Sequence, residues 1–494
     1  MPSFPSFSFD RFELNTFTRR LMCDGQPIPI ADRHFDVLYR LVSGAGELIT
    51  KDALVGAGWG DVAVTDNSLE QAISALRRAL GTRADGSHYI ETVPRRGYRF
   101  SGAVERLIAK ASDDDLEAMM APHRAWVEGR AALETLEADQ VGRATRDFDQ
   151  VLEAFPDHAL AHVGLANAFA MRYEMTRTDA APNRDALAKA AEHAREACRL
   201  EPGLAEAWAT LGFVHSCSGQ PLEALAALRR AVTMEPDNWR HQFRLAYSSW
   251  GEERLRAARR TLAMLPGFPL AHLLAATVHV ARNLLDEAER ELQAGIVGQE
   301  APFDSRGSLR ASTPTRFNPV ALHWLLGLVL LAKGDEEGAL AEFERELAAE
   351  ASGHLYSREC CANTCYAIGA LRLRQEKQTE AQQAFAQALE RVPNHRLVSM
   401  VAAVQSLASF RERRGGALDV HVGKDSPFDE HFGLGIGLNV MGETARAVTV
   451  IDEALAAAPP GSAGWLLPVE PLLNVSASSG AWGSALSRLR ARAT

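Results

Sequence analysis

The sequence predicts a small α+β domain at the N-terminus, followed by an all-α solenoid of helical repeats. Strand and helix patterns mix only in the first part, strand signals vanish from about Ala121 onward, and small residues then recur at a twelve-residue spacing. At 494 residues, the chain is also too long for a single hydrophobic core. We therefore expect a domain over residues 1–104, a linker over 105–120 and a solenoid over 121–494.

Composition favours a folded protein of the cytoplasm. Hydrophobic residues make up 47% of the chain and charged residues 23%, which is ordinary for globular domains. The first ten residues lack the basic and apolar regions of a secretory signal, and the most apolar stretch, 321–332, is too short to span a membrane. The six cysteines have no regular spacing, so we expect Cys360, Cys361 and Cys365 to pack inside a helix rather than bind a metal.

Charge is distributed unevenly along the chain. The net charge is −10, yet residues 1–104 hold 12 basic and 12 acidic residues, so the acidity belongs to the rest of the chain. Arginine is locally in excess near the end of the first part, where only Asp85 and Glu91 oppose Arg77, Arg78, Arg83, Arg95, Arg96 and Arg99. Such an excess suits a surface that binds phosphates.

The first part begins with strands and continues with helices. Apolar and polar residues alternate over 7–14 and 20–30 around Asp24-Gly25, which predicts short antiparallel strands with a hairpin turn. The pattern then takes a helical period over 35–42, and a second helix follows after Thr50, its expected cap.

The clearest helix of this part is DNSLEQAISALRRALG, which begins at Asp66 or Asn67 and ends at Gly81. One face is apolar and predicts packing. A second, polar face is available to read DNA and consists of Asn67, Gln71, Ser74 and Arg78. Two simpler interpretations stay open: Asn67 as a helix cap only, and Arg77 and Arg78 as a solvated helix end.

Two further strands, expected over 89–93 and 97–100, are joined by a basic tip with Arg95 and Arg96. Gly97 is available there for an unusual backbone angle. A helix in the major groove, together with arginines on a hairpin aimed at the DNA backbone, is a recurrent docking geometry. Adjacent like charges repel each other, so the arginine pair is hard to explain without phosphate.

The segments GELITKDALVGAGWG, VTDNSLEQAISALRRALG and YIETVPRRGYRF resemble the OmpR/PhoB-type winged helix-turn-helix family over nearly all of residues 7–103. The resemblance is greatest to the CadC-like and HilA-like branch, which has this domain at the N-terminus and no receiver domain before it. It implies phosphate contacts for Trp59, Ser68 and Tyr98, although Trp59 could equally fill the core. Ser74 and Ala75 stand where the family often has arginines, so the target sequence cannot be inherited from the family.

The second part resembles tetratricopeptide repeats. In AWATLGFVHSCSGQPLEALAALRRAVTMEP, the residues at the repeat's characteristic positions are Trp208, Leu211, Gly212, Gly219, Ala224, Leu228, Ala231 and Pro236. Small residues at two of these positions let paired helices approach closely, and a large residue fills the gap. The same triplet recurs at Ala246/Ala258/Leu262, Ala276/Ala288/Leu292, Gly327/Ala339/Phe343, Gly369/Ala381/Phe385 and Gly435/Ala447/Ile451.

Breaks in the period predict surface loops over 176–183, 298–319 and 413–427. At one position of the first helix, successive repeats carry an apolar and aromatic stripe, made of Phe243, Leu273, Trp324, Tyr366 and Phe432. Such a stripe either lines a groove for an apolar partner or packs between the paired helices.

The chain shows no nucleophile motif, phosphate loop, dinucleotide fingerprint or metal-ligand set, so we expect neither an enzyme nor a bound cofactor. The leading hypothesis is a one-component, sequence-specific transcriptional regulator whose repeat arm binds a protein partner or a small effector. Its partners would be double-stranded DNA and that effector, with no membrane, and the solenoid could also supply a homodimer contact. The alternative is an adaptor whose winged domain contacts proteins and not DNA.

Overall fold

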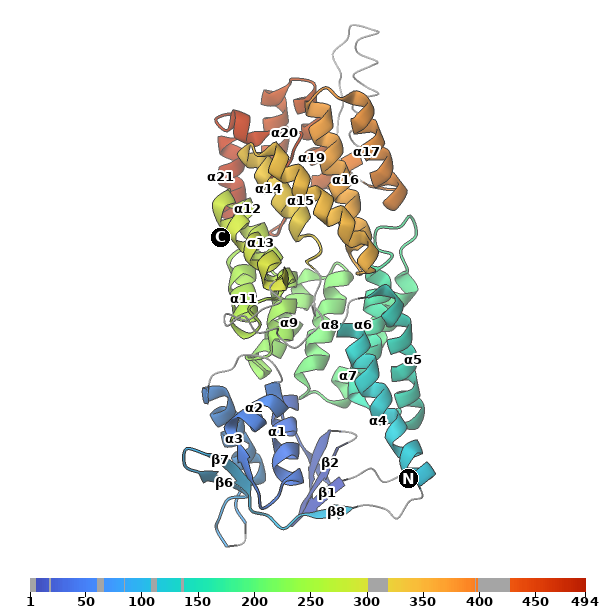
Figure 1. The fold of residues 1–494 in the computed structure, drawn as a ribbon, viewed down its shortest axis with the longest axis vertical. Coiled ribbons are helices and arrows are strands. Elements are labelled where there is room, and N and C mark those ends of the chain that lie inside the picture. The colour runs from blue at the N-terminus through green and yellow to red at the C-terminus, as the bar shows by residue number, and fades with distance from the viewer. Residues whose placement is uncertain are drawn as a thin grey trace.

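The computed structural model describes residues 6–16, 19–59, 66–83, 85–107, 113–134, 137–300, 319–395, 397–398 and 427–494. The N-terminal α+β domain lies at one end of an elongated molecule, and the last helices lie at the other (Figure 1). Among the described residues, no helix is both long and apolar enough to cross a membrane.

The N-terminal domain opens with an antiparallel sheet of order β4-β3-β2-β1-β8. Its strands are β1 (Ser6–Phe9), β2 (Phe12–Asn15), β3 (Arg20–Cys23), β4 (Gln26–Ile28) and β8 (Glu105–Leu107). Asp24 and Gly25, the expected turn, both have positive φ, at 49° and 76°. Two consecutive residues of positive φ are what a tight two-residue hairpin requires, so this prediction is confirmed.

The boundary after the first domain differs from the expected linker at 105–120. Strand β8 pairs with β1, with Ser6 opposite Leu107, and the first solenoid helix begins at Asp113. Pairing satisfies backbone groups of β1 that would otherwise form an open sheet edge. The domain therefore extends to residue 107.

Three helices and a second sheet of order β5-β7-β6 complete the domain. They are α1 (Asp32–Ser43), β5 (Leu48–Thr50), α2 (Lys51–Trp59), α3 (Asp66–Leu80), β6 (Ile90–Val93) and β7 (Gly97–Phe100). Ala53 donates its backbone N–H to Thr50 Oγ1 at 3.3 Å, which is the expected cap of α2. The order of helices and hairpin is that of a winged helix-turn-helix domain, so the predicted fold class is confirmed for this part.

Aromatic side chains fill the core between the first sheet and the hairpin. The rings of Phe9 and Phe100 lie edge to face at 5.0 Å, and Phe12 meets Tyr89 in the same way at 5.5 Å. Gly97 has φ of 148°, and a Cβ at this position would lie 2.0 Å from the carbonyl oxygen of Ile49. Glycine is therefore required where the wing meets β5.

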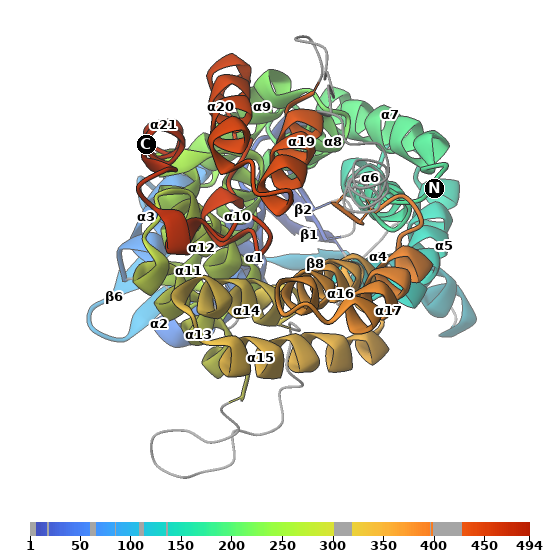
Figure 2. The same ribbon diagram turned by 90° about the horizontal axis from the view of Figure 1, so that it is seen from above.

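The rest of the described chain is helical. The first helices of the solenoid are α4 (Asp113–Glu134), α5 (Ala138–Ala154), α6 (Ala159–Glu174), α7 (Arg184–Leu200), α8 (Ala205–Cys217), α9 (Pro221–Met234), α10 (Trp239–Ser248), α11 (Gly251–Met264) and α12 (Pro269–Ala281). The later ones are α13 (Leu285–Glu300), α14 (Leu322–Lys333), α15 (Glu336–Ala348), α16 (Ser357–Arg374), α17 (Gln378–Arg391), α19 (Phe428–Val440), α20 (Thr444–Ala457) and α21 (Gly483–Arg492). Viewed from above, they curl around a common axis (Figure 2).

The small residues of the repeat triplets lie where two helices meet, as predicted. A Cβ on Gly327 would lie 2.4 Å from the ring of Phe343, and one on Gly369 would lie 2.5 Å from the ring of Phe385. Each large residue therefore occupies the space that the missing side chain leaves. The tetratricopeptide-like pairing of helices is confirmed.

The end of the chain departs from the repeat pattern. Between α20 and α21 the chain forms turns and two short 3-10 helices, η2 (Leu467–Val469) and η3 (Val475–Ser478). Helix η2 packs against α12 and α14, and Trp465, just before it, meets Trp324 edge to face at 6.3 Å. This terminal segment thus turns back against helices of the middle repeats.

One of the three predicted loops and all three cysteines lie within the described residues. Residues 176–183 form turns between α6 and α7, as expected. The other two expected loops, 298–319 and 413–427, lie almost entirely outside the described residues. Cys360, Cys361 and Cys365 are all buried in α16, which confirms the prediction that they pack inside a helix.

Candidate nucleic-acid interface

Helix α3 has one buried and one open face. Leu69 and Leu76 are almost fully buried in the core of the domain. Gln71, Ser74 and Arg78 are exposed on the other side, as the helical spacing predicts. The side chain of Asn67, the fourth residue expected on this face, lies outside the described residues.

The wing presents two arginines at its tip. Arg95 and Arg96 are exposed in the turn between β6 and β7, where Val93 pairs with Gly97. Arg95 has a φ of 64°, a left-handed conformation that tightens this turn. Neither guanidinium forms an ion pair with any carboxylate in the described part of the chain.

Two arginines of the predicted basic group have structural roles instead. Arg77 donates to the carbonyl oxygen of Ile90 at 2.8 and 3.0 Å and to Thr92 Oγ1 at 2.8 Å, which ties α3 to β6. Arg83 lies 3.8 Å from Asp85. The sequence shows an excess of arginine here but not which side chains turn back onto the domain.

Trp59 and Tyr98, for which the family resemblance implies phosphate contacts, both lie in the core. Their side chains are only 8% and 5% exposed and belong to the main hydrophobic cluster of the domain. For Trp59 this is the packing interpretation that the sequence left open. Tyr98 lies in the middle of the second sheet, opposite Ile49 on one side and Thr92 on the other.

Ser68, the third residue implied to contact phosphate, meets the solenoid. Its hydroxyl donates to a carboxylate oxygen of Asp237 at 3.3 Å, and Asp237 lies in the turn between α9 and α10. Arg33 of α1 donates to the backbone oxygen of the same aspartate. Arg20 pairs with Glu201 at 3.1 Å, so three polar contacts between described residues join the winged domain to the solenoid.

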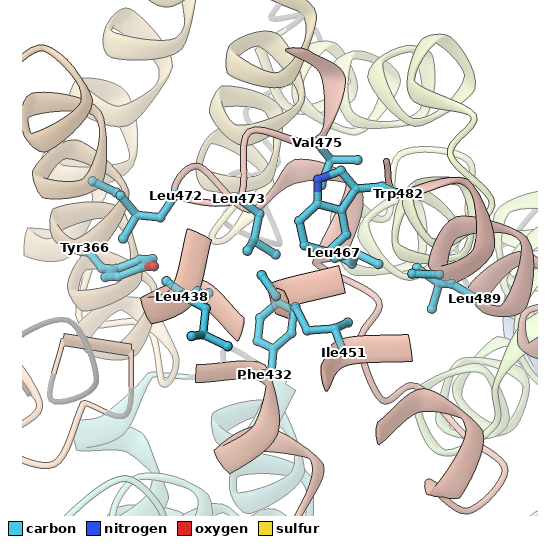
Figure 3. Close-up of a cluster of buried hydrophobic side chains, with 14 of the residues drawn as sticks. Tyr366, Phe432, Leu438, Ile451, Leu467, Leu472, Leu473, Val475, Trp482 and Leu489 are labelled. Carbon is cyan, nitrogen blue, oxygen red and sulfur yellow. The ribbon is translucent and has the colours of Figure 1, made fainter. Parts of the chain in front are cut away.

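The solenoid helices line a partly open cavity of about 520 Å³. Four residues of the predicted stripe line it, namely Phe243, Leu273, Trp324 and Tyr366. Phe432 lies instead among the buried side chains of the C-terminal helices, with Leu438, Ile451 and Leu467 around it (Figure 3). The stripe is thus part cavity wall and part core.

Tyr366 carries a buried polar contact at the edge of this cavity. Its hydroxyl donates to Glu470 Oε1 at 2.7 Å, and Glu470 belongs to the terminal segment. Burial raises the pKa of Glu470 to about 7, although the hydrogen bonds from Tyr366 and from the backbone of Leu472 lower it. The terminal segment therefore contributes a polar group to the cavity wall. The repeat pattern of the sequence does not predict this group.

Comparison with known proteins agrees with this division. Residues 25–100 match the family described as the C-terminal domain of transcriptional regulatory proteins, and residues 218–263 match a tetratricopeptide repeat. The DNA binding domain of CpxR from E. coli is 29% identical; the match covers 20% of this chain and 100% of that one, with a TM-score of 0.19. The two family matches identify an OmpR/PhoB-type domain at the N-terminus and a tetratricopeptide repeat after it.

Two curated relatives are regulators by name. The transcriptional regulator HilA of Salmonella typhimurium (strain LT2) is 39% identical over 99 residues, which are 20% of this chain and 17% of that protein. The cholera toxin homolog transcriptional activator of Vibrio parahaemolyticus is 37% identical over 79 residues, 16% of this chain and 27% of that protein. The chain therefore covers only a minor part of either relative.

Proposed function

We propose that this protein is a sequence-specific transcriptional regulator, in which the winged domain binds double-stranded DNA and the solenoid receives an effector or a protein partner. The observation that carries the proposal is the exposed polar face of α3, together with two exposed wing arginines that have no carboxylate partner among the described residues. The family match of residues 25–100 and the relatives named as regulators support it.

In this proposal α3 enters the major groove with its exposed face toward the bases. Gln71 is suited to a bidentate contact with adenine, and Arg78 to guanine or to a phosphate near the end of the helix. Arg95 and Arg96 would then contact the backbone or the minor groove beside the helix. A single small module buries too little surface for tight specific binding, so the proposal includes paired sites read by a homodimer.

Asp237 of the solenoid contacts a residue of the proposed DNA interface. A phosphate at the N-terminal end of α3 would need the Ser68 hydroxyl, which in this structure is bonded to the Asp237 carboxylate. A carboxylate and a phosphate are both acceptors and repel each other at short range. The docked solenoid therefore competes with DNA at this one position, while Gln71, Ser74 and Arg78 stay exposed.

The proposal predicts that Gln71→Ala relaxes base selection without removing general DNA affinity. Losing one bidentate base contact costs roughly 1 to 2 kcal/mol, about a five- to thirtyfold loss of discrimination at one base pair. The measurement is a binding titration against a panel of single-base variants of a selected site. Gln383→Ala, an exposed glutamine of α17, is the matched control and should leave the selectivity unchanged.

The adaptor alternative would be favoured by two results together. The wild-type chain would bind all single-base variants of the DNA site equally, and Gln71→Ala would show the same lack of selectivity. The slope of affinity against salt separates the two effects, because a base contact contributes little to it and phosphate contacts dominate it.

A further inference from the structure

A buried carboxylate lies in the wall of the solenoid cavity. Glu470 belongs to the terminal segment between α20 and α21 and is only 4% exposed. Its Oε1 accepts two hydrogen bonds, from the Tyr366 hydroxyl at 2.7 Å and from the backbone N–H of Leu472 at 3.1 Å. Among the described residues, no group donates to its Oε2 and no cation pairs with the carboxylate.

The surroundings of Glu470 favour a cation that comes from outside the chain. Burial is the main cause of the raised pKa of this carboxyl, and no charged side chain among the described residues changes that pKa. The arginines elsewhere in the cavity wall therefore leave it uncompensated, and Arg177, for example, pairs with Glu174 and Glu359 instead. A buried carboxylate is costly unless it is paired, so a cationic ligand that reaches Glu470 gains from its charge.

Aromatic side chains of the same cavity suit the rest of such a ligand. Trp465, five residues before Glu470, packs against both the hydrophobic cluster that contains Tyr366 and the one beside Trp324. It meets the ring of Trp324 edge to face at 6.3 Å, and all three aromatic residues line the cavity. Aromatic faces attract ammonium groups as well as apolar surfaces, and tryptophan does so most strongly.

We infer that the cavity binds a small amine with an aromatic or apolar body, its ammonium group held by Glu470 and its body packed against Trp324 and Trp465. The volume of about 520 Å³ lies within the roughly 300 to 1,000 Å³ of small-molecule sites. The inference rests on the proposed function, because it names the chemical class of the effector.

The residues of this site come from segments that are far apart in the sequence. Glu470 and Trp465 belong to the terminal segment, Trp324 to α14 and Tyr366 to α16. Tyr366 and Leu472 belong to one buried cluster, which joins the terminal segment to α16 (Figure 3). A bound amine would add a further link between the terminal segment and the repeats, so it should raise the unfolding temperature of the full chain.

The test is isothermal titration calorimetry of the full chain at neutral pH with two probes, tryptamine and tryptophol. The two molecules differ in that the first carries an ammonium group where the second carries a hydroxyl. We expect Glu470→Gln to raise the Kd of tryptamine about tenfold, as loss of a charged hydrogen bond does, and to leave that of tryptophol unchanged. Glu344→Gln, on the exposed face of α15, removes the same charge from the chain and should change neither Kd.

Tyr366→Phe is a second, independent variant that keeps the aromatic ring. It removes one of the hydrogen bonds that lower the pKa of Glu470, so less of the carboxyl is ionised at neutral pH. The Kd of tryptamine should therefore rise, by a smaller factor than in Glu470→Gln, while the Kd of tryptophol stays the same. Thermal unfolding without a probe shows whether each variant is folded.

Three results would overturn the inference: no binding of tryptamine, equal affinity of the wild type for both probes, or an unchanged Kd of tryptamine in folded Glu470→Gln. If Glu470→Gln does not fold, an unchanged Kd of tryptamine in Tyr366→Phe overturns it instead. The titration contains no DNA, so its failure would leave the proposed DNA binding untouched, and a failure of DNA binding would leave this result untouched.

Discussion

The double substitution of Arg95 and Arg96 by glutamine is expected to weaken DNA binding about a hundredfold on every sequence tested. Both guanidinium groups are exposed and have no carboxylate partner in the described part of the chain, so the change removes little besides contacts with DNA. Hydrogen bonds to charged groups contribute about 1.5 to 3 kcal/mol each, and two of them account for this loss.

The measurement is a fluorescence anisotropy titration at several salt concentrations. Loss of two phosphate contacts should lower the slope of log affinity against log salt by about 2. Arg259→Gln with Arg260→Gln is the matched control, because it removes an equally exposed pair of arginines from α11. If the wing variant bound DNA as the wild type does, the assignment of the wing to the interface would be wrong.

Loosening the contact between the domains is expected to strengthen DNA binding about tenfold. The change is Glu201→Gln with Asp237→Asn, which neutralises the carboxylates that bond to Arg20 and Ser68. The reason is competition: a winged domain held on the solenoid must give up these contacts before Ser68 can meet a phosphate. A partly buried ion pair and one charged hydrogen bond together are worth about 1 to 2 kcal/mol.

Removing two negative charges also raises affinity for DNA in a general way, so the control must match the charge change. Glu337→Gln with Glu344→Gln does so on the exposed face of α15. Competition at the interface predicts a gain in the first variant that clearly exceeds the gain in the second, measured at physiological salt. Equal gains would mean that only net charge is at work.

Local patterns made most of the fold predictable from the sequence. The Asp24-Gly25 turn, the cap at Thr50 and the wing all depend on neighbouring residues, and each lies where it was expected. The close approach of Gly327 to Phe343 follows from a fixed spacing within one helix pair. Repeat proteins show short-range regularity of this kind in their sequences, because each repeat contacts mainly its neighbours.

Contacts between distant segments could not be predicted in this way. Ser68 and Asp237 are 169 residues apart, and no periodicity links them. The terminal segment with Glu470 breaks the repeat, so its position at the cavity wall had no signal in the sequence. The same reason explains the stripe: equal positions in successive repeats become cavity wall or core according to what covers them, as Phe432 shows.

Arg77 and Arg78 show why the residues of the candidate DNA interface could not all be predicted from the sequence. Arg77 and Arg78 are adjacent and chemically identical, yet Arg77 bonds to Ile90 and Thr92 while Arg78 is exposed. The helical turn places successive residues about 100° apart, so only the position of β6 decides which of the two is structural.

Binding of the full chain to fragments of its own genome is the measurement that decides whether the winged domain recognises DNA. We expect a few fragments to be enriched, and their affinity to fall steeply and linearly on a log–log plot as salt rises. Retention of no fragment at low salt, or equal retention of all fragments, would contradict this expectation.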